Sequence, residues 1–256
     1  KKETDQAIAQ LKQQEKQLQQ DINKSRAEAR QVDRAIQNAI RREIEAARKK
    51  ELAAAAARKR IADARRRAQR EAARKKALAA AKKAGRKPPP KPVEKEEDDD
   101  APEATTSRED VLAATPEALS LSRDFESNRG RLPWPVDAGR ITGHFGTSKV
   151  GKVQVEHNGI VIATAKGAAV KAIFDGEVIM VFSVPGAGYM VTLRHGKYFT
   201  NYVRLVNVRV SKGMSVKRGH VLGAAAASAI TSNGEIELQI YRNMVQQNPE
   251  RWIRGR

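Results

Sequence analysis

The sequence lacks cysteine and holds few aromatic residues, and each shortage limits what the chain can be. Without cysteine it has no disulfide framework, no cysteine-ligated zinc or iron–sulfur site and no thiol nucleophile. Aromatic residues make up 4% of the 256 residues and none precedes Phe125, so a sizeable core is expected only in the second half. There is no run of about 18 apolar residues, so no membrane-spanning helix is predicted.

The charge is unevenly distributed and divides the chain into segments. The net charge is +19; residues 1–86 hold 26 basic and 11 acidic side chains, whereas residues 87–110 hold 4 and 9. Such shifts in composition predict several domains. We expect a helical arm over 1–86, a linker over 87–106, a helical segment over 107–127 and a globular domain over 128–256.

The arm is predicted to be a long helix that takes part in a coiled coil. It has no proline and no glycine before Gly85, and it is rich in good helix formers. Its first half carries apolar positions three and four residues apart, if Glu15 and Ser25 are allowed as polar members. These seam positions are Ile8, Leu11, Leu18, Ile22, Ala29, Val32, Ile36 and Ala39. Because the chain begins within this repeat, we expect the arm to be incomplete at its N-terminus. Beyond Ile44 the apolar positions thin out, and a helix upstream of Lys1 is the partner considered for this half.

A basic helix could also bind nucleic acid by neutralising phosphates. No aromatic residues are interleaved with the basic ones for stacking on bases, and no reading-helix motif is present. We therefore expect no nucleic-acid partner and keep this function only as an alternative.

Residues 87–127 are predicted to be a linker followed by a short helix. Pro88 to Pro90 end the arm, and the acidic run from Glu94 to Asp100 favours an unfolded connection. Ser107 and the pair Thr115-Pro116 are typical helix starts. A helix this short needs to bury its apolar side chains, which are Val111, Leu112, Leu119, Leu121 and Phe125.

From Arg131 onward the pattern is that of short strands with glycine-containing turns. The spacing predicts a mostly antiparallel sandwich or open barrel. Asp175-Gly176 is expected to turn a hairpin between 170–172 and 177–182. Other expected strands cover 153–156, 189–194, 198–205, 206–210, 216–222 and 235–241.

Several motifs in this region occur together in one known family. They are Gly130–Val136 (GRLPWPV), Ile141–Gly146 (ITGHFG), His157–Val161 (HNGIV), Lys166–Ala172, Asp175–Val178, Arg194–Gly196, Asn201–Leu205 and Asn248–Ile253. Residues 128–254 resemble the LytM-type zinc peptidase domain, and specifically that of the EnvC-like murein hydrolase activators. The Leu-Pro-Trp-Pro sequence after a helical arm is the feature typical of the activators.

The resemblance also implies where a metal would bind. In active LytM-type enzymes the histidine and aspartate of His-x-x-x-Asp and the second histidine of His-x-His hold zinc. The corresponding positions here are His157, Val161 and Glu237, and the assisting histidine of Tyr-x-His corresponds to Arg204. Because zinc needs three protein ligands and an open position, we expect no metal, no cofactor and no hydrolysis. A zinc-dependent cell-wall endopeptidase stays as the alternative.

What the resemblance implies instead is a non-catalytic protein that binds a peptidoglycan amidase and activates it during cell separation. The expected binding groove consists of Asn158, Val161, Tyr202, Arg204, Glu235, Glu237 and Tyr241. Residues 107–127 would cover it, and the coiled coil would dock on an FtsEX-type division transporter. We expect a periplasmic location, with an export signal removed before Lys1. From the residues alone, Val161 could equally be core, Tyr202 sheet packing, and Arg204 a partner of Glu237.

Overall fold

The computed structural model describes residues 2–83 and 111–255, apart from 151, 152, 185, 187, 229, 230 and 232. The chain divides into two compact units, residues 1–45 with 112–256, and residues 46–111. The predicted linker over 87–106 lies outside the described residues. So do residues 107–110, and with them the helix start expected at Ser107.

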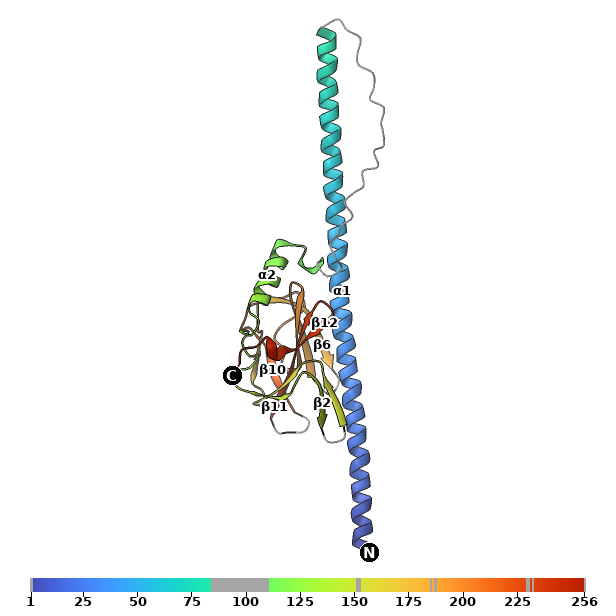
Figure 1. The fold of residues 1–256 in the computed structure, drawn as a ribbon, viewed down its shortest axis with the longest axis vertical. Helices are drawn as coiled ribbons and strands as arrows, with labels where there is room; N and C mark the ends of the chain where they lie inside the picture. The colour runs from blue at the N-terminus through green and yellow to red at the C-terminus, as the bar shows by residue number, and fades with distance from the viewer. Residues whose placement is uncertain are drawn as a thin grey trace. The chain divides into compact units, whose positions relative to one another are not determined.

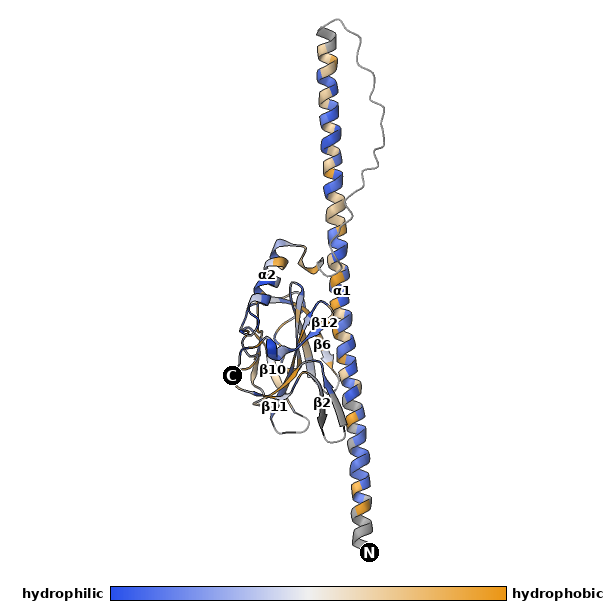
Figure 2. Cartoon of the chain, in the orientation of Figure 1, coloured by the Kyte–Doolittle hydropathy of each residue, from blue (hydrophilic) through white to orange (hydrophobic). Residues whose placement is uncertain are grey.

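A single helix, α1 (Lys2–Lys83), confirms the expected helical arm (Figure 1). Its length follows from uninterrupted helix formers without proline or glycine. Hydrophobic positions are scattered along a mostly hydrophilic helix (Figure 2). Ile8, Leu11, Leu52, Ile61 and Leu78 are exposed, and no helix pairs with α1 in the described ranges. The coiled coil therefore remains a prediction.

The β region forms one large sheet and one small one, all with antiparallel pairing, as expected. The main path of the large sheet is β1 (Arg140–Gly143), β4 (Ile160–Thr164), β11 (Gly234–Arg242), β10 (Val221–Ala227), β8 (Tyr198–Val206), β7 (Gly188–His195), β6 (Gly176–Val184) and β9 (Ser215–Val216). β12 (Val245–Gln247) pairs with β11, and β5 (Ala169–Lys171) pairs with β10. β2 (Gly146–Val150) and β3 (Val153–His157) form the separate two-stranded sheet.

Three local predictions in this region are wrong. The strand expected over 216–222 is interrupted, because residues 217–220 form a turn between β9 and β10. Asp175-Gly176 does not turn a hairpin, because β5 pairs with β10 while β6 pairs with β7 and β9. The Asp175 carboxylate instead accepts hydrogen bonds from the backbone of Arg218 and the side chain of Lys217. Residues 207–210 form no strand, since β8 ends at Val206 and Asn207 takes a positive φ of 50°.

The segment before the sheet confirms the predicted helix start. A short 3-10 turn, η1 (Val111–Ala113), precedes helix α2 (Pro116–Ser127). Thr115 is the N-cap of α2, and its hydroxyl accepts a hydrogen bond from the backbone N–H of Ala118. Phe125 is fully buried and stacks on His195 and Tyr198, with ring centroids 4.9 Å away in both cases. α2 therefore closes the hydrophobic core, which also contains Trp252.

The large sheet has two faces with different surroundings. Ile236, Leu238 and Ile240 of β11 point into the hydrophobic core, on what we call the core face. Alternate residues of a strand point to opposite sides, so Glu235, Glu237, Gln239 and Tyr241 lie on the other side. We call that side the site face. None of the helices in the described ranges combines the length and apolar composition that a bilayer span needs.

Candidate functional site

His157 and Val161 meet at the edge of the site face, beside Gly143. A Cβ atom added at Gly143 would lie 2.9 Å from Cγ2 of Val161 and 3.2 Å from Nε2 of His157. Gly143 thus has no room for a side chain because these two residues occupy the space. The pair expected from the His-x-x-x-Asp motif is therefore adjacent in space, with valine in place of the aspartate.

Glu237 stands at the centre of the site face. Antiparallel pairing places it directly opposite Val161 of β4 and Val203 of β8. Its Oε1 accepts a 2.7 Å hydrogen bond from Nε2 of Gln239. Burial raises the pKa of the Glu237 carboxyl, although that hydrogen bond and the nearby Arg204 and His157 oppose the rise. His157, Arg204 and Glu237 thus lie close enough to interact electrostatically.

Arg204 reaches the same face through an irregular backbone. Its φ is +66°, which is uncommon for a residue with a side chain and costs conformational energy. Its guanidinium lies 3.2 Å from Oε1 of Glu235, not against Glu237, and Ser228 donates to the other oxygen of Glu235. Glu235 is therefore paired with Arg204, the residue that corresponds by resemblance to the assisting histidine of Tyr-x-His.

These residues do not fit a zinc ion. Zinc takes three protein ligands in a catalytic site, and of the three positions that the resemblance aligns with metal ligands only His157 and Glu237 carry donor atoms. Val161 and Val203 flank Glu237 on both neighbouring strands, and the Arg204 cation would repel a metal. Within the described part of the chain, no three His, Cys, Asp or Glu side chains are grouped as a metal site.

Helix α1 contacts the site face through two acidic residues. Asp33 accepts hydrogen bonds from the Tyr241 hydroxyl at 3.2 Å and from the Asn158 amide at 3.3 Å. Burial raises the pKa of Tyr241, and the Asp33 charge adds to the rise, so the hydroxyl stays a donor. Glu43 pairs with Arg194 at 2.9 Å, and Arg194 also pairs with Glu177 at 2.7 Å.

Three aliphatic residues of α1 lie beside these contacts and are buried. Val32 is 6% exposed, and Ile36 and Ile40 are fully buried. Residues four apart share one face of a helix, so the three form a single apolar strip. On the sheet, Met190, Phe199 and Val203 are also buried, although they lie outside the main core cluster. Residues 28–43 of α1 thus cover part of the site face.

The other groove residues from the sequence fall in two places. Asn158, Val161, Arg204, Glu235, Glu237 and Tyr241 lie together on or beside the site face, as the contacts above describe. Tyr202 does not, because it pairs opposite Leu238 on the core face, where its hydroxyl accepts a hydrogen bond from the Ile173 backbone. Burial raises the pKa of Tyr202 to about 12.

The segment expected to cover the groove also lies elsewhere. Leu112 and Phe125 are buried, Leu121 packs against the core, and Leu119 is 38% exposed. Phe125 contacts the core face of the sheet, the side opposite Glu237. The side chain of Val111 is outside the described residues.

Sequence reasoning missed Asp33, Ile40, Glu43, Arg194 and Gln239 at this site. One signal was available for Gln239, since Glu235, Glu237, Gln239 and Tyr241 alternate with Ile236, Leu238 and Ile240 along one strand. No comparable signal existed for Asp33 and Glu43, which resemble any other acidic residue on an exposed helix.

Comparison with known proteins places the β region in a family. Residues 155–249 match peptidase family M23. The peptidoglycan DD-endopeptidase ShyB of Vibrio cholerae is 35% identical over 128 residues, which are 47% of this chain and 28% of ShyB. The murein hydrolase activator EnvC of Escherichia coli is 29% identical over 140 residues, 53% of this chain and 32% of EnvC.

Among solved structures, a zinc-containing peptidase from Vibrio cholerae shares 29% sequence identity with this chain, and the superposition has a TM-score of 0.43. The match covers 50% of this chain and 41% of that one. The chain spans about a third or less of the length of the two curated relatives. The match over 155–249 identifies the β region of this chain as a peptidase M23 domain of the LytM type.

Proposed function

We propose that the chain is a non-catalytic activator of a peptidoglycan amidase in the bacterial cell envelope. The observation that carries this proposal is the surroundings of Glu237, where two valines and an arginine stand around the metal position. A site with two donors and a fixed cation cannot hold zinc and lower the pKa of a bound water. The relative EnvC, named a murein hydrolase activator, supports a role in activation.

The site face has the properties of a surface that binds a helix. It presents buried apolar residues beside fixed polar groups, namely Asn158, Tyr241 and Arg194, which is the pattern of helix-in-groove recognition. α1 residues 28–43 already use it in this way, with an aliphatic strip accompanied by two acidic residues. We propose that a segment of the amidase binds the same face.

The covering element in this proposal is therefore α1 residues 28–43, not residues 107–127. If the helix and an amidase compete for one face, only molecules with the face uncovered bind the amidase. The apparent affinity then falls by the uncovered fraction. Docking of the arm on an FtsEX-type transporter, and a periplasmic location, belong to the same proposal and rest on the resemblance to EnvC.

A zinc-dependent endopeptidase is the second candidate, because the relative ShyB is named a peptidoglycan DD-endopeptidase. It would require a third ligand that the described residues do not supply. Measuring the zinc content of the purified protein separates the two candidates directly.

The deciding experiment measures solubilisation of dye-labelled murein sacculi by an amidase alone, by this protein alone, and by both together. We expect release only with both proteins, at a rate above that of the amidase alone. Release by this protein alone, lost on removal of zinc, would establish the endopeptidase instead. No increase with any cell-envelope amidase from the same organism would refute the activator.

A further inference from the structure

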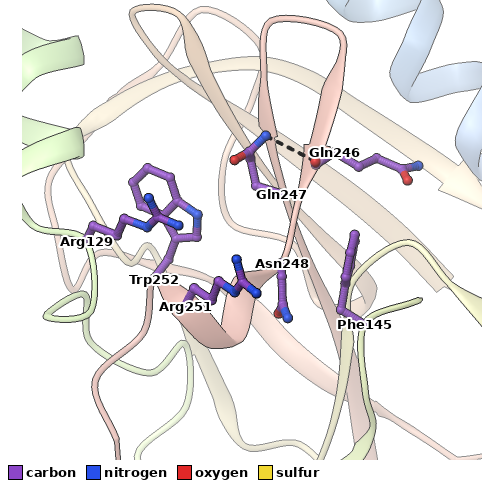
Figure 3. Close-up of a pocket in the computed structure, with 7 residues that line it drawn as sticks. All are labelled: Arg129, Phe145, Gln246, Gln247, Asn248, Arg251 and Trp252. Carbon is purple, nitrogen blue, oxygen red and sulfur yellow. Dashed lines mark hydrogen bonds between the residues drawn. The ribbon is translucent and has the colours of Figure 1, made fainter. Parts of the chain in front are cut away.

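A second candidate site is a cavity of about 310 Å³ at the end of the domain that holds η2 (Pro249–Arg251) (Figure 3). Its lining combines two arginines, three carboxamides and two aromatic rings: Arg129, Phe145, Gln246, Gln247, Asn248, Arg251 and Trp252. Gln246 connects it to the site face by donating a hydrogen bond to the Tyr241 hydroxyl at 3.2 Å, and among the described residues no other lining residue forms a hydrogen bond with a site-face side chain. The proposed amidase contact therefore does not account for this cavity.

The two arginines bring positive charge that no carboxylate among the described residues neutralises. Neither Arg129 nor Arg251 takes part in an ion pair there. Glu250 is next to Arg251 in sequence, but its two oxygens are directed at the His144 ring, 3.1 Å away, and at the Phe145 backbone N–H. Guanidinium groups in this state bind carboxylates and phosphates well.

One wall of the cavity is rigid. Trp252 is 3% exposed and packs on Phe125 and Tyr198, with ring centroids 5.1 and 5.2 Å away. The Arg129 guanidinium lies over the indole ring, 5.4 Å from its centroid, and Figure 3 shows this stacking. A preformed wall means that a ligand loses little affinity to ordering of the protein.

The carboxamides are positioned to bind neutral polar groups. Oδ1 of Asn248 accepts a 2.9 Å hydrogen bond from the Glu250 backbone, which fixes that side chain. Nε2 of Gln247 donates to the backbone oxygen of Gln246 at 3.1 Å, which leaves its Oε1 as an acceptor (Figure 3). Carboxamides both donate and accept, as hydroxyl groups of a sugar require.

We propose that this cavity binds an acidic sugar or a similarly small polar ligand that carries a carboxylate or phosphate. The volume lies at the small end of ligand sites, which suits a single ring and not a polymer chain. Arg129 and Arg251 hold the acidic group, and the carboxamides bind hydroxyl groups. This site is independent of the amidase contact, so either proposal can fail without the other.

The test is a calorimetric titration of the full chain with three sugars that share one ring: glucose, glucuronate and glucose 6-phosphate. We expect saturable binding of at least one charged sugar, at least tenfold tighter than glucose and weakened by salt. Comparing glucuronate with glucose 6-phosphate shows which acidic group the site prefers.

Arg251→Gln and Arg129→Gln should each weaken binding of the charged sugar about tenfold. Arg209→Gln removes another exposed arginine, which lies outside the cavity, and should leave binding unchanged. The proposal is overturned if neither charged sugar binds saturably, if glucose binds as tightly, or if Arg251→Gln behaves like Arg209→Gln. Arg251 is exposed, so its variant is expected to fold, and circular dichroism checks this.

Discussion

Glu237 occupies a position where its charge is costly. Its carboxyl lies in a partly buried strand between two valines, and burial raises its pKa despite the hydrogen bond from Gln239 and the nearby Arg204. A carboxylate held in this way weakens the fold at neutral pH, because the charged form is less favourable there than in water.

The first prediction is that Glu237→Gln stabilises the domain. Glutamine keeps an oxygen to accept the hydrogen bond from Gln239 but carries no charge, so the free energy of unfolding at pH 7 should rise by about 1 kcal/mol. Urea denaturation measures the change. Glu235→Gln is the matched control: it breaks the ion pair with Arg204 and should lower stability by about 0.5 kcal/mol. Equal destabilisation by both changes would contradict this account of Glu237.

His195 is a second residue whose ionisation is tied to the fold. It is fully buried; Nδ1 donates to the Asp175 backbone oxygen, and Nε2 lies 2.9 Å from the Thr200 hydroxyl. Burial lowers its pKa from 6.5 to about 4, although the Asp175 backbone and charge oppose the change. The neutral ring is therefore the form that the core accepts.

The second prediction concerns acid stability. Between pH 6.5 and 4 the unfolded chain protonates His195 while the folded chain does not, so protons favour unfolding. Stability should be fully present above pH 6.5 and fall as the pH drops towards 4, by up to about 3 kcal/mol. Urea midpoints measured across this range test it. In His195→Gln the loss of stability between pH 6.5 and 4 that comes from His195 should vanish, even if the variant is less stable overall. If stability falls with pH as steeply as in the unchanged protein, other groups cause the effect.

The residue pattern of the site could be predicted from the sequence only in part. The positions of His157, Val161 and Glu237 followed from motifs, and the structure brings them together. Tyr202 was expected in the groove with Arg204, because both stand at positions of the Tyr-x-His motif, and a regular strand would put residues two apart on one face. The positive φ of Arg204 and the register shift between β7 and β8 break that alternation, so Tyr202 points into the core. A bulge of this kind has no signature in the sequence here.

At the scale of elements, α1 was predicted well as a helix but less well in its contacts. Periodicity identifies an apolar strip without naming what covers it. The seam was assigned to a partner helix, whereas its second part, Val32 and Ile36, is buried with Ile40 against the domain. Ile40 was not in the predicted seam because the heptad placed Ala39 there.

The third prediction tests α2 as part of the core. Phe125→Ala should lower the free energy of unfolding by about 3–5 kcal/mol, because it removes a fully buried ring that stacks on His195 and Tyr198. Leu119→Ala, on the exposed side of the same helix, should change stability by less than about 0.5 kcal/mol. Thermal or urea denaturation of both variants is sufficient. If Phe125→Ala left stability unchanged and raised amidase activation, α2 would be a removable cover after all.

At the scale of the whole molecule, the two faces of the sheet have separate roles in the proposed function. The core face is closed by α2 and the C-terminal residues, which maintain the domain. The site face is covered by a segment of α1, which is held by three aliphatic side chains and three polar contacts. A few contacts of this kind can be exchanged for those of a partner without unfolding the domain, whereas the contacts of Phe125 cannot.

The fourth prediction follows from that difference. Ile36→Asp places a charge at a fully buried side chain of α1. The change should weaken the binding of residues 28–43 to the site face by about 3 kcal/mol and leave the domain folded. If covering limits binding, the apparent affinity for the amidase should rise by up to about a hundredfold, and murein release should rise with it. Ile8→Asp makes the same chemical change on the same helix where the side chain is 51% exposed, and should alter neither quantity. The test is to measure the amidase affinity of both variants by calorimetry and their murein release in the sacculus assay. If Ile36→Asp binds the amidase no more tightly than Ile8→Asp, residues 28–43 are a fixed part of the domain. The amidase would then bind another surface.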